Sequence, residues 1–339
     1  MVTPTAQPNW LDLTQEEVLE PALPIIDPHH HLWDRGGHRY LLDELVDDLA
    51  GHNVRQTVFV ECMSMYRAEG PKPLSPVGET EFVQGITAQS ASGAYGELRA
   101  CTGIVSYADL RLGDAVSEVL EAHIAASPHG FRGIRHAAGW DTSEDVANSH
   151  TKPPQHLLDD SAFRDGLTRL GAYGLSFDAW LYHSQIPELT DLARAFPDIP
   201  IILNHLGGPI GIGPYLGHRA EIFDQWQLDI VQLATCPNVV AKVGGIQMAR
   251  LNGYDWHERP KPPSSDDLLA ENRHWYLHLI EQFGPERCMF ESNFPVEKDS
   301  CSYTVLWNQF KKLTRGFPAD ERAAMFHDTA ARVYRLDPR

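Results

Sequence analysis

Three consecutive histidines, His29, His30 and His31, directly follow the apolar run Leu23-Pro24-Ile25-Ile26 and the pair Asp27-Pro28. Side chains two positions apart point to the same side of an extended chain, so His29 and His31 can converge on one point while His30 faces elsewhere. Two imidazoles at the carboxyl end of an apolar strand are typical of a metal site. The alternative interpretation is a solvated polar turn.

A second histidine, His205, ends the apolar run Ile201-Ile202-Leu203-Asn204 just before a glycine-rich turn. It is a candidate metal ligand or acid/base residue, unless it is simply a hydrogen-bonded histidine at a strand end. A further run leads through Asp178 to His183, and these two residues lie on opposite faces by parity. Only one of them can point to the same side as the other histidines, and the sequence leaves that register open.

Two glutamates also follow strand-like runs. Glu61 comes after Phe59-Val60, and Glu291 comes after Met289-Phe290. A carboxylate among several histidines can serve as a metal ligand or as a general base. Either glutamate could instead pair with Lys242 or Arg135.

Two arginines, Arg132 and Arg135, lie on either side of Gly133 in the fourth strand-like run, and His136 follows directly. A guanidinium group suits a substrate carboxylate or a developing oxyanion, so these three residues are candidates for substrate binding. An ion pair between Arg135 and a glutamate is the simpler alternative, and Arg132 is the one we expect nearer the surface.

Short β-branched runs alternate with longer segments of helical periodicity, which predicts strand–helix units around a parallel sheet. The eight runs are Leu23–Asp27, Thr57–Glu61, Cys101–Val105, Gly133–His136, Leu175–Leu181, Ile201–His205, Val239–Val243 and Cys288–Glu291. Eight such units predict one distorted (β/α)8 barrel domain over 1–339, with an N-terminal extension at 1–20 and C-terminal helices at 318–336. The long connections Ser64–Thr80, Ala137–Asp160, Gly207–Gly217 and Asn252–Ser265 are then expected to wall the active face.

The composition excludes several other classes of protein. Lys and Arg total 28 against 46 Asp and Glu, and the net charge of −18 disfavours nucleic acid as a partner. The five cysteines are scattered without a Cys-x-x-Cys pair, which argues against a disulfide framework or a thiolate zinc site. No signal-peptide pattern occurs in 1–15, and no apolar run is long enough to span a membrane, so we expect a cytoplasmic protein with no membrane partner.

These motifs together resemble the amidohydrolase superfamily, and more narrowly its amidohydrolase-related branch of TIM-barrel metal-dependent hydrolases and lactonases, which includes some decarboxylases. The resemblance spans residues 25 to about 336. It rests, in chain order, on His29-x-His31, Gly130-Phe131-Arg132-Gly133-Ile134-Arg135-His136, Asn204-His205-Leu206-Gly207-Gly208-Pro209, Lys242-Val243-Gly244-Gly245 and Glu291-Ser292-Asn293-Phe294-Pro295. It implies a reacting centre at the carboxyl ends of the strands, with metal or substrate roles for His29 and His31 and a ligand or acid/base role for His205.

One residue departs from the family pattern. The last strand of the family usually ends in Gly-Ser-Asp-x-Pro, and the position of that metal-binding, proton-accepting aspartate is held here by Asn293. An amide has no titratable carboxylate and cannot act as a general base, although its oxygen can still accept a hydrogen bond from water. Glu61 and Glu291 are the carboxylates that could compensate, with Asn293 kept as a catalytic candidate.

Two versions of the chemistry follow. In the first, His29 and His31 hold a divalent metal together with His205 or Glu61. Imidazole ligands favour zinc, and the metal activates water. In the second, no metal is needed: the histidines and Arg135 polarise a carbonyl group while a carboxylate takes the proton from water.

Aromatic residues cluster in the connections that should form the mouth, and they favour a small cyclic or aromatic substrate. The candidates among them for substrate binding are Tyr66, Trp140, Trp180 and Tyr182. The resemblance then favours hydrolysis of a lactone or a related cyclic ester. The alternatives are decarboxylation of an aromatic or unsaturated acid and a degenerate barrel that only binds a ligand; a homodimer is also expected from the resemblance.

Overall fold

The computed structural model describes residues 9–337, so the part of the expected N-terminal extension at 1–8 lies outside the described residues. Eight parallel strands follow one another around a ring in chain order. They are β1 (Pro24–His30), β4 (Asn53–Val60), β5 (Arg99–Ser106), β6 (Phe131–Ile134), β7 (Ser176–Ala179), β8 (Ile201–Leu203), β9 (Val239–Val243) and β10 (Cys288–Phe290). A parallel bridge between His30 and Phe294 joins the first strand to the segment after the last one. Each of the eight predicted runs overlaps one of these strands, and the predicted barrel is confirmed.

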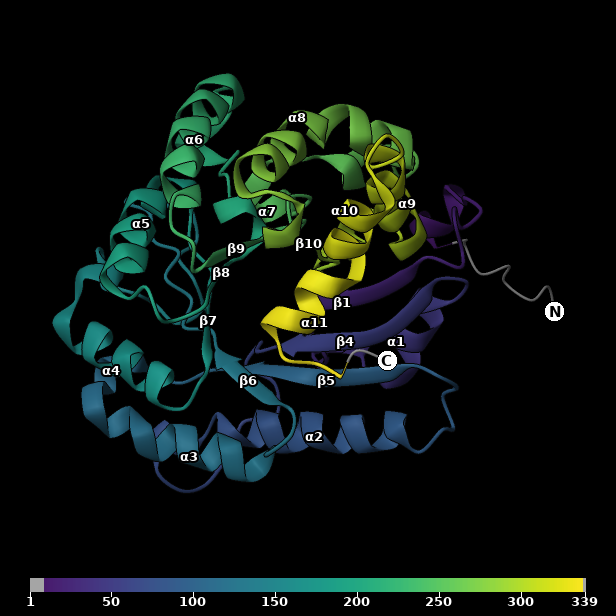
Figure 1. The fold of residues 1–339 in the computed structure, drawn as a ribbon. Coiled ribbons are helices and arrows are strands. Elements are labelled where there is room, and N and C mark those ends of the chain that lie inside the picture. The colour runs from purple at the N-terminus through teal and green to yellow at the C-terminus, as the bar shows by residue number, and fades with distance from the viewer. Residues whose placement is uncertain (1–8, 338–339) are drawn as a thin grey trace.

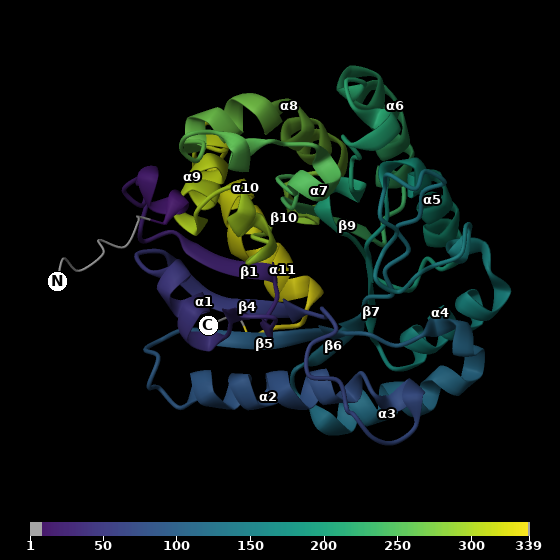
Figure 2. The ribbon, with the colours of Figure 1, turned by 180° about the vertical axis from the view of Figure 1, so that it is seen from behind.

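Most helices surround the ring of strands, and the last one closes an end of it (Figure 1, Figure 2). They are α1 (Leu42–Leu49), α2 (Val77–Ala91), α3 (Val116–Ala126), α4 (Ser161–Ala172), α5 (Ile186–Ala195), α6 (Arg219–Ala234), α7 (Ala249–Asn252), α8 (Ser265–Phe283), α9 (Tyr303–Leu313), α10 (Ala319–Ala323) and α11 (Thr329–Val333). The expected connection Ser64–Thr80 is too long, because α2 already begins at Val77. The expected C-terminal helices are α10 and α11, joined by a π-helical turn.

The barrel interior has an apolar layer at its amino end. Side chains from the strands, such as Ile26, Val58 and Ile202, pack there against Val333 and Tyr334 from the C-terminal segment. In Figure 1, α11 crosses the centre of the ring. Because this segment closes the amino end, polar side chains in the interior can meet solvent only through the carboxyl end.

A two-stranded hairpin, β2 (Trp33–Arg35) and β3 (His38–Tyr40), leaves the carboxyl end of β1. Its turn residues Gly36 and Gly37 have φ angles of 60° and 85°, a conformation that glycine adopts without strain and that matches the twist of the two strands. The hairpin therefore carries Trp33, Arg35 and His38 to the mouth of the barrel.

All five cysteines are free thiols, as expected from their spacing. Among residues 9–337, no helix is both long enough and apolar enough to cross a membrane.

Candidate active site at the carboxyl end of the barrel

A cavity of about 570 Å³ opens at the carboxyl ends of the strands. The predicted residues that line it are His31, Arg135, Trp180, His205 and Asn293. It is also lined by Trp33, Arg35, Gly36, His38, Cys62, Met63, His150, Met248, Arg250 and Val296. His31 and Arg135 directly follow a strand end, and His205 and Asn293 follow within three residues, which is where a barrel of this type presents reactive groups.

The two outer histidines of the triplet point the same way, as the alternation predicts. The ring centroids of His29 and His31 are 5.0 Å apart, and those of His29 and His205 are 4.4 Å apart. His30 faces the other side, where its Nε2 lies 2.8 Å from the hydroxyl of Thr57. The first and sixth of the predicted runs therefore bring their imidazoles together.

His205 is held by Glu291 through two contacts. Oε1 of Glu291 accepts a hydrogen bond from Nδ1 of His205 at 2.7 Å and another from the backbone N–H of His205 at 3.0 Å. A Cβ atom on Gly245 would lie 1.9 Å from Nδ1 of His205, so only glycine leaves room for this ring. With Nδ1 carrying the proton, the lone pair of His205 is on Nε2.

Arg135 contacts two of the predicted residues, Glu61 and His29. Its Nε donates to Oε1 of Glu61 at 2.7 Å, its Nη2 donates to the Glu61 carbonyl oxygen at 2.5 Å, and its Nη1 lies 3.2 Å from Nε2 of His29. Because arginine can only donate, Nε2 of His29 is the acceptor of this contact. Nζ of Lys242, also a donor, lies 3.3 Å from Nδ1 of the same ring. Oε2 of Glu61 pairs with Nε2 of His150 at 3.0 Å. Burial alone raises the pKa of Glu61, but the charges of Arg135 and His150 outweigh it and lower that pKa, so Glu61 is an anion.

The open register of β7 is resolved in favour of Asp178. Its Oδ2 accepts hydrogen bonds from Nζ of Lys242 at 2.8 Å, Nδ2 of Asn204 at 3.0 Å and the hydroxyl of Tyr334 at 2.8 Å. His183 lies beyond the strand, where its Nδ1 accepts a hydrogen bond from the backbone N–H of Ile210. Asp178 therefore belongs to the barrel interior, below the cavity floor.

Asn293 connects His31 to a buried glutamate. Its side-chain amide lies 3.3 Å from Nε2 of His31 and 3.2 Å from Oε1 of Glu297. Burial raises the pKa of Glu297 to about 8. The amide therefore sits next to a carboxyl group that is protonated at neutral pH, a place in which a second carboxylate would be disfavoured.

Burial is the largest influence on the clustered histidines, and it lowers the pKa of His29, His31 and His205. The charges of Lys242 and Arg135 lower the pKa of His29 further, whereas Glu291 opposes the shift at His205. These imidazoles are thus neutral near pH 7, the form in which they bind metal or accept a proton.

Comparison with known proteins identifies the family. Residues 26–336 match the family described as amidohydrolase. The chain belongs to this family. An uncharacterized protein, y4mH, of Sinorhizobium fredii is 34% identical over 334 residues, which cover 92% of this chain and 98% of that protein. An L-fucono-1,5-lactonase of Burkholderia ambifaria is 26% identical over 328 residues, covering 92% of this chain and 96% of the lactonase.

A solved amidohydrolase from Burkholderia multivorans with bound zinc has the same fold. Its TM-score is 0.69 at 22% sequence identity, with 92% of this chain and 99% of that chain covered. At this identity the likeness establishes the amidohydrolase-like TIM barrel and no more.

A metal ion has a suitable place in this amidohydrolase fold. His29, His205 and Glu291 offer ligand atoms within 4.8 Å of one another, the combination of two imidazoles and a carboxylate that catalytic zinc sites use. Oε2 of Glu291 is buried and accepts no hydrogen bond among the described residues, although it lies 2.7 Å from Nδ1 of His29. A buried carboxylate oxygen without a donor is costly, and a cation would satisfy it.

The charges around this group also fit a cation. Inside the barrel, the carboxylates of Asp178, Glu61 and Glu291 face the two cationic side chains of Lys242 and Arg135. One negative charge is therefore left when the histidines are neutral. His31, which we predicted as a ligand, is not a member of the group, because its Nδ1 lies 2.7 Å from the Val60 carbonyl and its Nε2 faces Asn293. The buried group His29, His205 and Glu291 could therefore hold a metal.

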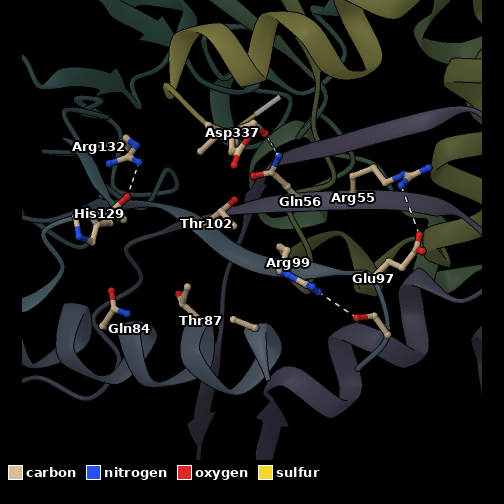
Figure 3. A pocket seen from close by; sticks show the side chains of 14 residues that line it. Arg55, Gln56, Gln84, Thr87, Glu97, Arg99, Thr102, His129, Arg132 and Asp337 are labelled. Atoms are coloured by element: carbon tan, nitrogen blue, oxygen red, sulfur yellow. Dashed lines mark hydrogen bonds and ion pairs between the residues drawn. The ribbon is translucent and has the colours of Figure 1, made fainter. Parts of the chain in front are cut away.

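Arg132 does not lie at this mouth. It lines a second cavity of about 640 Å³ around the amino-terminal parts of β4, β5 and β6, together with Arg55 and Arg99 (Figure 3). Arg132 and Arg135 are three positions apart, an odd separation that turns their side chains to opposite faces. The expectation that both arginines meet the same substrate is wrong.

Four other predicted substrate-binding residues are also absent from the cavity wall. His136 is buried behind β6, where its Nδ1 accepts a hydrogen bond from the backbone N–H of Leu110. The Tyr182 hydroxyl donates to the Ala147 carbonyl oxygen, and its ring packs in a small apolar cluster. Trp140 and Tyr66 are partly buried outside the cavity wall.

Sequence reasoning missed several residues of the site. Lys242 was considered only as a partner of Glu61 or Glu291, and Glu297 was unassigned. His150, Arg35 and Arg250 come from connections without periodicity. Lys242 had a usable signal, since a lysine within the apolar strand Val239–Val243 must find a buried partner.

Proposed function

We propose that this chain is a hydrolase that opens a lactone or a related cyclic ester at the carboxyl end of its barrel. The observation that carries the proposal is the His205–Glu291 pair beside the cavity. Glu291 holds the proton of His205 on Nδ1, which leaves Nε2 to accept a proton from a water molecule.

Arg135 is the group placed to stabilise the developing oxyanion. Of its five N–H donors, three are used by Glu61 and His29, and two are left for a ligand in the cavity that it lines. A charged donor fixed in place before the reaction lowers the barrier without reorganisation, and Glu61 supplies that fixation.

His150 supports departure of the ring oxygen. It lines the cavity, and its Nε2 lies 3.0 Å from Oε2 of Glu61. In the proposed reaction, the oxygen of water bonds to the carbonyl carbon and the ring C–O bond breaks. The water proton goes to Nε2 of His205, and the ring oxygen takes a proton from His150. The product is a hydroxy acid.

His29, His205 and Glu291 would hold a divalent ion, for which imidazole ligands favour zinc. Such an ion would supply a bound water with a pKa of about 7. In that form His205 and Glu291 serve as ligands, and in a metal-free form they serve as the base pair described above. The family assignment and the lactonase relatives support the reaction class in both forms.

The test is a panel of lactones incubated with the purified protein, with ring opening followed by a pH indicator and metal content measured on the same sample. Proton release with at least one lactone that is lost in His205→Asn supports the proposal. Carbon dioxide release from an aromatic acid without any ring opening would instead favour a decarboxylase. Binding without turnover of either class would indicate a degenerate site.

A further inference from the structure

We propose that the substrate of this site carries a carboxylate group and that Arg35 and Arg250, at the rim of the cavity, bind it. This inference rests on the proposed ring-opening function and names the substrate class for it. Its starting point is the charge of the cavity wall. Three arginines and four histidines line the cavity, and none of its lining residues is an aspartate or a glutamate, in a chain whose net charge is −18.

Arg135, on the floor of the cavity, does not require a substrate anion to balance its charge. Arg135 already has the buried carboxylate of Glu61 at 2.7 Å, and its charge is compensated there. A substrate carboxylate next to Arg135 would also approach Glu61, which is an anion. The floor is therefore suited to a neutral ester carbonyl rather than to a charged group.

The two rim arginines are in the opposite situation. Arg35 donates from Nη2 to the Cys62 carbonyl oxygen at 2.8 Å and stacks over the ring of Trp33 at 4.8 Å, but no carboxylate of residues 9–337 lies within ion-pair distance of it. Arg250, on the short helix α7, makes no ion pair or hydrogen bond with any described side chain. Both side chains are exposed, line the same cavity, and leave guanidinium donors for a ligand.

The rest of the wall disfavours a neutral polyhydroxylated ring. Sugar hydroxyls require both donors and acceptors. The lining arginines can only donate, and apart from the histidines, Asn293 supplies the one side-chain amide. The remaining surface is largely apolar or aromatic, with Trp33, Trp180, Met248 and Val296. A flat or apolar ring with a carboxylate at its outer end fits this wall, with the ester carbonyl on the floor and the carboxylate at the rim.

The positive rim also has a kinetic role. An anion approaching a protein of net charge −18 is repelled at long range, so a local cationic entrance is needed for efficient capture. This attraction is screened by salt.

The experiment compares two lactones that differ only in one substituent, a carboxylate or its uncharged primary amide, on the wild-type enzyme and on Arg35→Gln and Arg250→Gln. Arg273→Gln is the charge-matched control, because Arg273 is exposed on α8, away from the cavity. For each rim variant we expect KM for the acid to rise about 10- to 100-fold, the range for loss of a charged hydrogen bond, with KM for the amide nearly unchanged. Arg273→Gln should leave both values unchanged.

A wild-type enzyme that prefers the amide, or rim variants that lose the same factor on both lactones, would overturn the inference. Calorimetric measurement of the binding of the two ring-opened products tests the carboxylate site independently of the proposed ring-opening function. Both products carry the carboxylate formed by ring opening, and they differ only in the substituent. Tighter binding of the product with the second carboxylate, lost in Arg250→Gln, would support the carboxylate site even if no lactone were opened. Equal binding of both products would overturn the carboxylate site, whether or not ring opening occurs.

Discussion

Oε1 of Glu291 accepts two hydrogen bonds from His205, one from the ring at 2.7 Å and one from the backbone at 3.0 Å. The backbone of His205 has a positive φ of 53°, which is uncommon for residues other than glycine, although histidine adopts it more often than most. The glutamate therefore fixes both the position and the tautomer of an imidazole in an unusual conformation. This arrangement of the site depends on Gly245 and on the buried charges beneath it.

Replacing Gly245 by alanine should displace His205. The added Cβ would lie 1.9 Å from Nδ1 of His205, and Gly245 has a φ of 65° that alanine adopts only with strain. We expect ring opening to fall at least about 100-fold, the contribution of a positioned general base. Gly85→Ala is the matched control, because no atom lies within 4 Å of its added Cβ and it should leave activity unchanged. Full activity of Gly245→Ala would mean that the position of His205 does not matter.

Lys242→Met should destabilise the fold. The lysine is fully buried and its Nζ lies 2.8 Å from Oδ2 of Asp178, so its removal leaves a carboxylate without its cation inside the barrel. We expect a loss of about 3–5 kcal/mol in the free energy of unfolding, the range for one broken partner of a buried ion pair. Lys298→Met, which breaks the partly exposed pair with Asp48, should cost less than about 1 kcal/mol. Denaturant titrations of both variants check this, and equal losses would contradict it.

Glu79 should make the protein less stable as pH rises. It is buried under the loop that carries Met63, and its Oε1 accepts hydrogen bonds from the backbone N–H groups of Cys62 and Ser64. Burial and then the charge of Glu61 raise its pKa from 4.5 to about 8. A raised folded-state pKa favours the protonated, folded form, so this contribution is full below about pH 4.5 and is lost as pH rises through about 8.

The comparison that isolates this effect is the melting temperature of the wild type and of Glu79→Gln at several pH values between 4.5 and 9. The amide keeps an oxygen for both backbone donors but does not titrate. We expect the difference between the two proteins to shift in favour of the variant as pH increases. A difference that stays constant across this range would show that Glu79 does not titrate there.

The substitution Asn293→Asp, which restores the aspartate of the family pattern, should not be tolerated by itself. The new carboxylate would lie beside Glu297, whose pKa burial already raises to about 8, and two such groups cannot both ionise at low cost. We expect Asn293→Asp to lose stability above neutral pH. The double variant Asn293→Asp, Glu297→Gln should regain that stability, with a coupling free energy of at least about 1 kcal/mol between the two substitutions. Thermal unfolding at pH 6 and pH 9 measures this coupling, and strict additivity of the two substitutions would rule it out.

The barrel and the centre of the site could be predicted from the sequence, because both follow from the alternation of side chains along single strands. His29 and His31 share a face by parity, and Glu61, Arg135 and Glu291 each come one residue after a strand end. The same rule separates Arg132 from Arg135, so that error was avoidable. Arg35, His150 and Arg250 could not be assigned in this way, since their positions depend on how three separate connections fold over the mouth. No local pattern encodes that arrangement.

The most direct test of the central claim is the rate of lactone opening by Glu291→Gln compared with the wild type, at matched metal content. Glutamine preserves the shape of the side chain but removes the charge that orients and polarises His205. We predict a fall of about 100- to 10,000-fold in kcat, the range for loss of general base catalysis, with little change in KM. An unchanged kcat in a folded Glu291→Gln protein would contradict the account, because the reaction would then proceed without the His205–Glu291 pair.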